Sequence, residues 1–160
     1  MMLRTETFRQ LGGFDSRYFM YAEDMDLCFK VRRSGLKIHH VPQAEIVHHG
    51  GCSSRTQFSK FSVVMICEAI HFYLLSNLGC LQAGLYRSLM ALAALLRMLV
   101  LVMTWLSASK ETRVARRVAI LKWWTVLRWS LGLEGWAKGR FGGEEHPPLW
   151  TTGYQGQLID

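Results

Sequence analysis

The chain of 160 residues is 50% hydrophobic and carries 19 lysines and arginines against 12 aspartates and glutamates, a formal net charge of +7. This composition excludes a wholly disordered chain, and the length suits one domain with a buried core. Because a basic soluble protein usually has a polar surface, the positive mean hydropathy points to an anionic membrane surface, with nucleic acid as the competing partner.

Composition divides the chain into three regions. Residues 1–56 hold the dense histidine and glycine motifs, residues 57–131 are apolar and basic, and residues 132–160 are rich in glycine and proline, which predicts irregular structure. The four cysteines are irregularly spaced and no secretory leader is recognisable at the start of the sequence. We therefore expect reduced thiols and a cytoplasmic setting.

The first region is predicted to be α/β. Residues 5–11 are expected to form a short helix that stops at two glycines. Residues 22–34 have apolar side chains at helical spacing, arginines in the last turn, and Gly35 in position for a left-handed cap. Two short strands are predicted at residues 37–41 and 44–48.

The second region is predicted to be helical, at residues 58–78, 88–109 and 110–129. In the window 88–109, the central Arg97 costs about 2.5–3.5 kcal/mol and offsets leucines and valines that favour insertion by about 0.3–0.6 kcal/mol each. The sequence therefore does not establish a helix that spans the bilayer. Residues 110–129 alternate basic, apolar and tryptophan side chains, which is typical of an amphipathic helix at a membrane interface.

Three acidic residues, Glu23, Asp24 and Asp26, occupy the first turn of the helix predicted at residues 22–34. Free backbone amides and the helix dipole favour an ionised carboxylate there, and such a group can accept a proton from an attacking hydroxyl. The alternative is that these acids only stabilise the start of the helix, with Asp26 paired to Lys30 one turn later.

A histidine pair, His48 and His49, precedes two glycines that can bring an imidazole to a backbone bend close to a ligand. Neutral imidazole binds divalent ions, which commonly accompany substrates that carry phosphate. A strand end with hydrogen-bonded histidines is an equally good explanation. A zinc site that includes Cys52 can be drawn, but its spacing matches no zinc-finger pattern.

Residues 8–51 together resemble the C-terminal half of the catalytic domain of family 2 glycosyltransferases, especially the rhamnosyltransferase-like bacterial members. The resemblance rests on an ordered series of short motifs: GGFD at residues 12–15, FMY at 19–21, ED at 23–24, DLC at 26–28, Gly35, VP at 41–42 and HHGG at 48–51.

This resemblance implies an inverting sugar transfer on a GT-A fold, from a nucleotide-sugar donor to a glycan or lipid-linked acceptor. Asp24 would be the base that deprotonates the acceptor hydroxyl, and Glu23 would lie beside it in the acceptor site. Gly12, Gly13 and Phe14 would shape the acceptor loop.

The resemblance also implies a divalent metal, Mg²⁺ or Mn²⁺, that holds the donor diphosphate through His48, with His49 as the second choice. In this family an N-terminal half ending in Asp-x-Asp binds the donor, and no such motif occurs before Glu23. We therefore expect an incomplete GT-A half at residues 1–56, inactive without a missing N-terminal half.

The remaining helices are similar to the membrane-associating helices that follow the catalytic domain in many relatives. The expected location is the cytoplasmic face of the cell membrane, peripheral or integral. The alternative is a non-catalytic membrane-associated helical module in which residues 80–131 are the working part. Nucleic acid is not expected as a partner, because the basic residues lie on apolar helices without interleaved polar readers.

Overall fold

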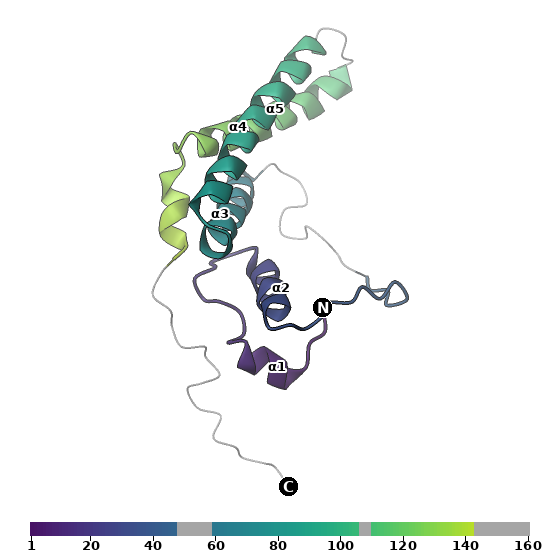
Figure 1. Cartoon of the computed structure of the whole chain (residues 1–160). Coiled ribbons are helices and arrows are strands. Elements are labelled where there is room, and N and C mark those ends of the chain that lie inside the picture. Colours follow the sequence, from purple (N-terminus) through teal and green to yellow (C-terminus); the bar gives the residue numbers. More distant parts are fainter. Residues whose placement is uncertain (48–58, 106–109, 143–160) are drawn as a thin grey trace.

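The computed structural model describes residues 1–47, 59–105 and 110–142 of the chain. The helices in these ranges are α1 Thr5–Gln10, α2 Glu23–Arg33, α3 Lys60–Asn77, α4 Cys80–Met103, α5 Lys110–Ser130 and the 3₁₀ helix η1 Gly135–Arg140. The helices α3, α4 and α5 pack together, and α4 and α5 run side by side as a long pair that extends away from α1 and α2 (Figure 1).

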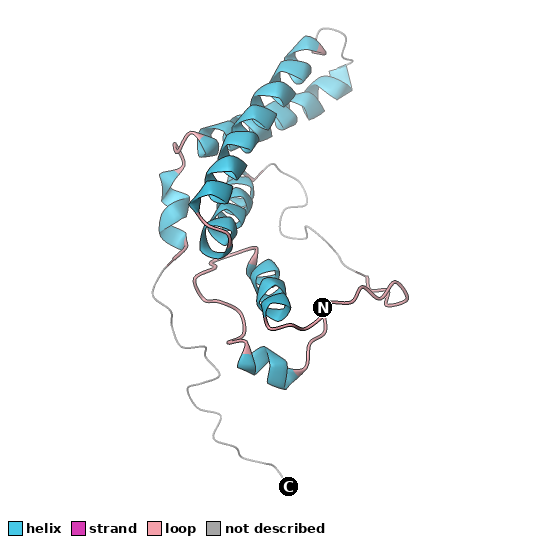
Figure 2. Cartoon of the chain, viewed as in Figure 1, coloured by secondary structure: helices cyan, strands magenta, loops and turns pink. Residues whose placement is uncertain are grey.

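The prediction of an α/β fold, with an incomplete GT-A half at residues 1–56, is wrong: the described ranges contain only helices and loops (Figure 2). The two predicted strands are irregular chain, as far as residue 47, with one turn closed by the Ala44 amide and the Val41 carbonyl at 3.1 Å. A strand needs a neighbouring backbone to pair with, and no described segment supplies one.

Both helices predicted in the first region are confirmed. Helix α1 ends where Gly12 and Gly13 take left-handed φ values of 77° and 68°, and the Gly13 amide donates to the Phe8 carbonyl at 2.9 Å. Helix α2 ends at Gly35, whose φ of 81° lets the next amide reach the Val31 carbonyl at 3.2 Å. The glycines therefore terminate both helices as predicted.

The core lies where α3, α4 and α5 meet. Trp129 of α5 is its largest fully buried side chain, and it shares a buried cluster with Val64 of α3 and Ala94 of α4. Arg87 of α4 donates to the carbonyls of Trp129 and Ser130 at 2.6 and 2.9 Å. The end of α5, whose last carbonyls have no partner within the helix, is thus satisfied from α4.

One face of α4 is open and apolar. The helix has 24 residues, is long and apolar enough to cross a membrane, and is little buried. Its exposed side chains include Leu85, Leu89, Leu92, Leu96 and Leu99, the last of them 59% exposed. Exposed apolar faces are typical of surfaces that contact lipid or another protein.

Glu134, just before η1, is a buried carboxylate that joins three elements. It accepts hydrogen bonds from Arg128 at 2.8 Å and Trp136 at 2.8 Å, and it pairs with Lys60 at 2.9 Å. Burial tends to raise the pKa of Glu134, but these hydrogen bonds and charges lower it to about 2. The glycine-rich segment that follows α5 is therefore fixed to the helices as far as residue 142.

Candidate functional site

The backbone is strained where α2 begins. Tyr21 and Ala22 have left-handed φ values of 67° and 62°, although neither is glycine. Such conformations cost about 1–3 kcal/mol each and persist only where the surrounding structure imposes them. Ala22 is buried with Tyr18 in the core cluster, and its carbonyl accepts from the Asp26 amide at 3.0 Å. This strained turn fixes the direction in which the acidic side chains of α2 project.

Glu23 and Asp24 differ in their surroundings. Asp24 is exposed, and its Oδ1 accepts from the Met25 amide at 2.8 Å, while its Oδ2 has no protein partner in the described ranges. Glu23 is half-buried, and its shielded Oε2 accepts no hydrogen bond from any described residue. A buried oxygen without a donor is costly, so Glu23 is suited to accept a hydrogen bond from a bound molecule.

Asp26 has a structural role. It is 3% exposed, its Oδ2 pairs with Lys30 at 2.9 Å, and its Oδ1 accepts from Asn77 at 3.0 Å and from the Tyr18 hydroxyl at 3.3 Å. Burial and the adjacent Asp26 charge raise the pKa of Tyr18, so that its hydroxyl remains a donor. The pairing with Lys30 is therefore confirmed, and Asp26 also connects α2 to α3.

The predicted acceptor loop closes α1. Phe14 packs edge-on against Phe8, with ring centroids 5.4 Å apart. Within the part of the chain that the structure describes, no hydrogen bond or ion pair joins residues 12–14 to Glu23 or Asp24. The role of residues 12–14 as an acceptor loop therefore stays a prediction.

Beside this loop, Asp15 and Arg17 form a bidentate pair that the sequence analysis missed. The Arg17 Nε lies 3.0 Å from Oδ1 and its Nη2 lies 2.7 Å from Oδ2. Burial tends to raise the pKa of Asp15, but the hydrogen bonds and charge of Arg17 outweigh this and lower it. An Asp-x-Arg spacing in a loop was the available signal.

The predicted metal ligands, His48 and His49, lie outside the described residues. Among the residues that the structure does describe, no three His, Cys, Asp or Glu side chains gather closely enough to hold a metal ion. The binding of a metal ion by His48 and His49 therefore stays a prediction.

An apolar cavity of about 580 Å³ lies on another side of α2. The N-terminus, α2 and residues 37–46 line it, with His39 and His40 at its wall, and it includes neither Glu23 nor Asp24. It is therefore separate from the acidic helix start.

The proteins to which part of this chain is similar are bacterial glycosyltransferases and an O-antigen biosynthesis protein. The chain is 40% identical over 60 residues to the rhamnosyltransferase WbbL of Escherichia coli. It is 47% identical over 49 residues to the N-acetylglucosaminyl-diphospho-decaprenol L-rhamnosyltransferase of Mycobacterium tuberculosis, and 34% identical over 55 residues to the O-antigen biosynthesis protein RfbC of Myxococcus xanthus.

These matches cover 38%, 31% and 34% of this chain and 23%, 16% and 4% of the three relatives, so the chain spans less than a quarter of their length. No family model and no solved structure matches the chain. The resemblance to rhamnosyltransferase-like glycosyltransferases is confirmed over the matched residues.

Proposed function

We propose that residues 1–56 are the acceptor-side segment of a family 2 glycosyltransferase. It would transfer a sugar, with inversion, from a nucleotide-sugar donor to a cell-surface glycan or lipid-linked acceptor. The observation that carries the proposal is the 40–47% identity to two named rhamnosyltransferases. In this proposal an N-terminal half with an Asp-x-Asp binds the donor, and residues 1–56 supply the acceptor side.

Asp24 is the proposed base. Its Oδ2 is free of protein partners in the described ranges, and its Oδ1 is held by the Met25 amide. Asp24 would take the proton of the acceptor hydroxyl while that oxygen forms a bond to the anomeric carbon. The bond from that carbon to the nucleoside diphosphate breaks, and the electron pair leaves with the diphosphate. Attack from the opposite side gives the inversion.

Glu23 and the loop at residues 12–14 are the proposed acceptor contacts. The unsatisfied Oε2 of Glu23 supports this role, because an acceptor hydroxyl could donate to it. The exposed ring of Phe14 offers an apolar surface for a sugar face.

A divalent metal, Mg²⁺ or Mn²⁺, remains a proposal for His48 and His49. The described residues do not by themselves form a metal site. When bound, such an ion would neutralise charge on the donor diphosphate. The residues of this chain act on the acceptor, and no step above depends on the ion.

We also propose that α4 and α5 hold the chain on the cytoplasmic face of an anionic membrane. The sequence of α5 contains six basic residues: Lys110, Arg113, Arg116, Arg117, Lys122 and Arg128. Each costs about 2.5–3.5 kcal/mol at a bilayer centre, so α5 does not cross. Because α4 packs along α5, the exposed leucines of α4 would enter one leaflet while the basic residues meet the headgroups.

The enzymatic proposal is tested with the full chain joined behind the N-terminal part of the Escherichia coli relative. Transfer of labelled rhamnose from its nucleotide-activated form to prenyl-diphosphate-linked N-acetylglucosamine is measured. We expect transfer by this chimera, and a loss of about 10²–10⁴-fold in Asp24→Asn, the range for a general base. Glu6→Gln, an exposed acid of α1, is the control. Full activity in Asp24→Asn would remove Asp24 as the base.

The second candidate is a non-catalytic membrane-associated helical module. It is favoured by the one helix in the described ranges, α4, that is apolar and long enough to enter a membrane. An inactive chimera whose chain still binds anionic vesicles would support this candidate and contradict the enzymatic proposal.

A further inference from the structure

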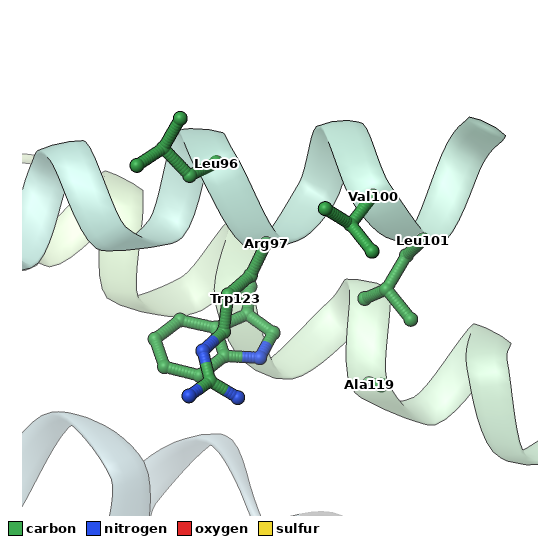
Figure 3. Close-up of a pocket in the computed structure, with 6 residues that line it drawn as sticks. All are labelled: Leu96, Arg97, Val100, Leu101, Ala119 and Trp123. Atoms are coloured by element: carbon green, nitrogen blue, oxygen red, sulfur yellow. The ribbon is translucent and has the colours of Figure 1, made fainter. Parts of the chain in front are cut away.

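A groove of about 380 Å³ lies between α4 and α5 (Figure 3). Its lining is mostly apolar, with one charged side chain: Leu96, Arg97, Val100, Leu101, Ala119 and Trp123. The volume falls within the range of small-molecule sites. A groove of this kind suits a molecule with a long apolar part and one anionic group.

Arg97 supplies the charge. Its guanidinium lies over the Trp123 ring, 4.8 Å from the ring centroid, and Figure 3 shows the two side chains against each other. In the described ranges no carboxylate or carbonyl accepts a hydrogen bond from Arg97. Contact through the face of a guanidinium leaves the N–H groups at its edge available, and their fork matches two oxygens of a phosphate.

The neighbouring residues leave Arg97 available to an anion from outside the chain, because the two helices contain few carboxylates of their own. Residues 80–130 contain eight lysines and arginines and one acidic residue, Glu111. On the same helix as Trp123, Arg116 has a buried Nη1 without a hydrogen-bond partner among the described residues. The positive charge of this pair of helices is therefore not neutralised by its own sequence.

We propose that this groove binds one phospholipid, with the phosphate diester on Arg97 and an acyl chain along Val100 and Leu101. The proposal rests on the membrane association proposed above. A lipid is favoured over free phosphate because the lining is largely apolar and continues into the exposed leucine face of α4. One phospholipid would then both fill the groove and pair with the guanidinium of Arg97.

The test is native mass spectrometry of the full-length chain, released from a mild detergent containing phosphatidylglycerol. We expect one retained phospholipid. Arg97→Gln should reduce the retained fraction about tenfold, the usual effect of losing a charge-assisted hydrogen bond. Ala119→Leu, which fills the groove and leaves every charge in place, should reduce it similarly. Circular dichroism verifies that both variants keep the helical signal.

Arg9→Gln is the matched control, because it removes the same charge from an exposed residue of α1 that does not line the groove. Its retained fraction should stay within about twofold of the parent chain, since surface charges contribute weakly to one site. Equal retention by the parent chain and the three variants would overturn the proposed lipid site. Release of the lipid by millimolar inorganic phosphate would overturn it as well.

Sedimentation with phosphatidylglycerol vesicles separates this inference from the membrane proposal. If the parent chain binds vesicles but retains no single lipid, the groove proposal fails alone. If it binds no vesicles, the membrane proposal fails as well.

Discussion

The indole Nε1 of Trp129 donates a hydrogen bond of 2.6 Å to Oε2 of Glu68, and both side chains are buried between α5 and α3. The other carboxylate oxygen of Glu68 lies 3.8 Å from Nδ1 of His71. Trp129 is thus both the largest side chain of the core and a donor to its buried carboxylate. This contact links α3 to α5 through two residues that lie 61 positions apart in the sequence.

Trp129→Phe should lower the free energy of unfolding by about 2–4 kcal/mol, because it leaves a buried carboxylate without its donor and opens a cavity. Urea denaturation followed by circular dichroism measures the change. Trp124→Phe, at a position 49% exposed on the same helix, should change it by less than about 1 kcal/mol. Equal effects would show that the hydrogen bond to Glu68 contributes nothing.

Glu134 should make stability depend on pH below neutrality. Its pKa is about 2 in the folded chain against an ordinary value of 4.5, so the unfolded state binds the proton first as the pH falls. The stabilisation from Glu134 is therefore complete above the ordinary value and is lost as the pH drops toward 2. Glu134→Gln should flatten the dependence of unfolding free energy on pH in this window. Parallel curves for the two proteins would contradict the assignment.

Substitutions of Asp26 and Asp24 should differ in their effect on stability, because Asp26 is buried and paired whereas Asp24 is exposed. Asp26→Ala removes the buried partner of Lys30 and Asn77 and should cost about 2–4 kcal/mol of stability. Asp24→Ala, exposed and two residues away, should cost less than about 1 kcal/mol, the range of a charge at a helix N-terminus. Urea midpoints of both variants measure this. A large loss in Asp24→Ala would assign that residue a structural role as well.

Gly35 and Gly84 should respond oppositely to alanine. Gly35 has a φ of 81° and open space where a methyl group would be added, so Gly35→Ala should destabilise by about 1–2 kcal/mol through backbone strain alone. Gly84 lies inside α4, also with open space around it, and Gly84→Ala should stabilise by about 0.5–1 kcal/mol. Thermal denaturation measures both, and changes of the same sign would contradict the left-handed cap.

The leucine face of α4 should determine vesicle binding. Leu99→Glu removes an exposed apolar side chain and adds a negative charge, so affinity for phosphatidylglycerol vesicles should fall at least tenfold, to judge from about 1.5–3 kcal/mol per buried leucine. Ser76→Glu, exposed on α3, adds the same charge away from this face and should have a smaller effect. Co-sedimentation measures the vesicle affinity of both variants. Equal losses would show that the added charge, and not the leucine face, determines binding.

Local patterns predicted the helices well and the sheet badly. Gly12, Gly13 and Gly35 fixed the ends of α1 and α2, because a left-handed residue is a property of a few neighbouring positions. The strands predicted near residues 37–48 depended on a distant partner that local alternation cannot supply. Helix α4 also begins at Cys80, eight residues earlier than predicted, because Gly79 both ends α3 and precedes α4.

The candidate site was predictable only in its residue types. The acidic triplet and the pairing of Asp26 with Lys30 follow from helical spacing. The contact from Asp26 to Asn77 spans 51 positions and has no local signal. The left-handed pair Tyr21 and Ala22 contradicts intrinsic preference, so no propensity rule could have predicted it.

Arg87 contacts Ser130 through the main-chain oxygen at 2.9 Å, whereas it contacts Trp129 through both the main-chain oxygen at 2.6 Å and the ring, whose centroid lies 5.0 Å from the guanidinium. Position 130 can therefore change identity during evolution while the two long helices keep their relative alignment. The same arginine leaves little tolerance for inserting or deleting a residue in either helix between this anchor and their far ends. In homologous chains, the residue at position 130 should therefore vary more than the lengths of α4 and α5.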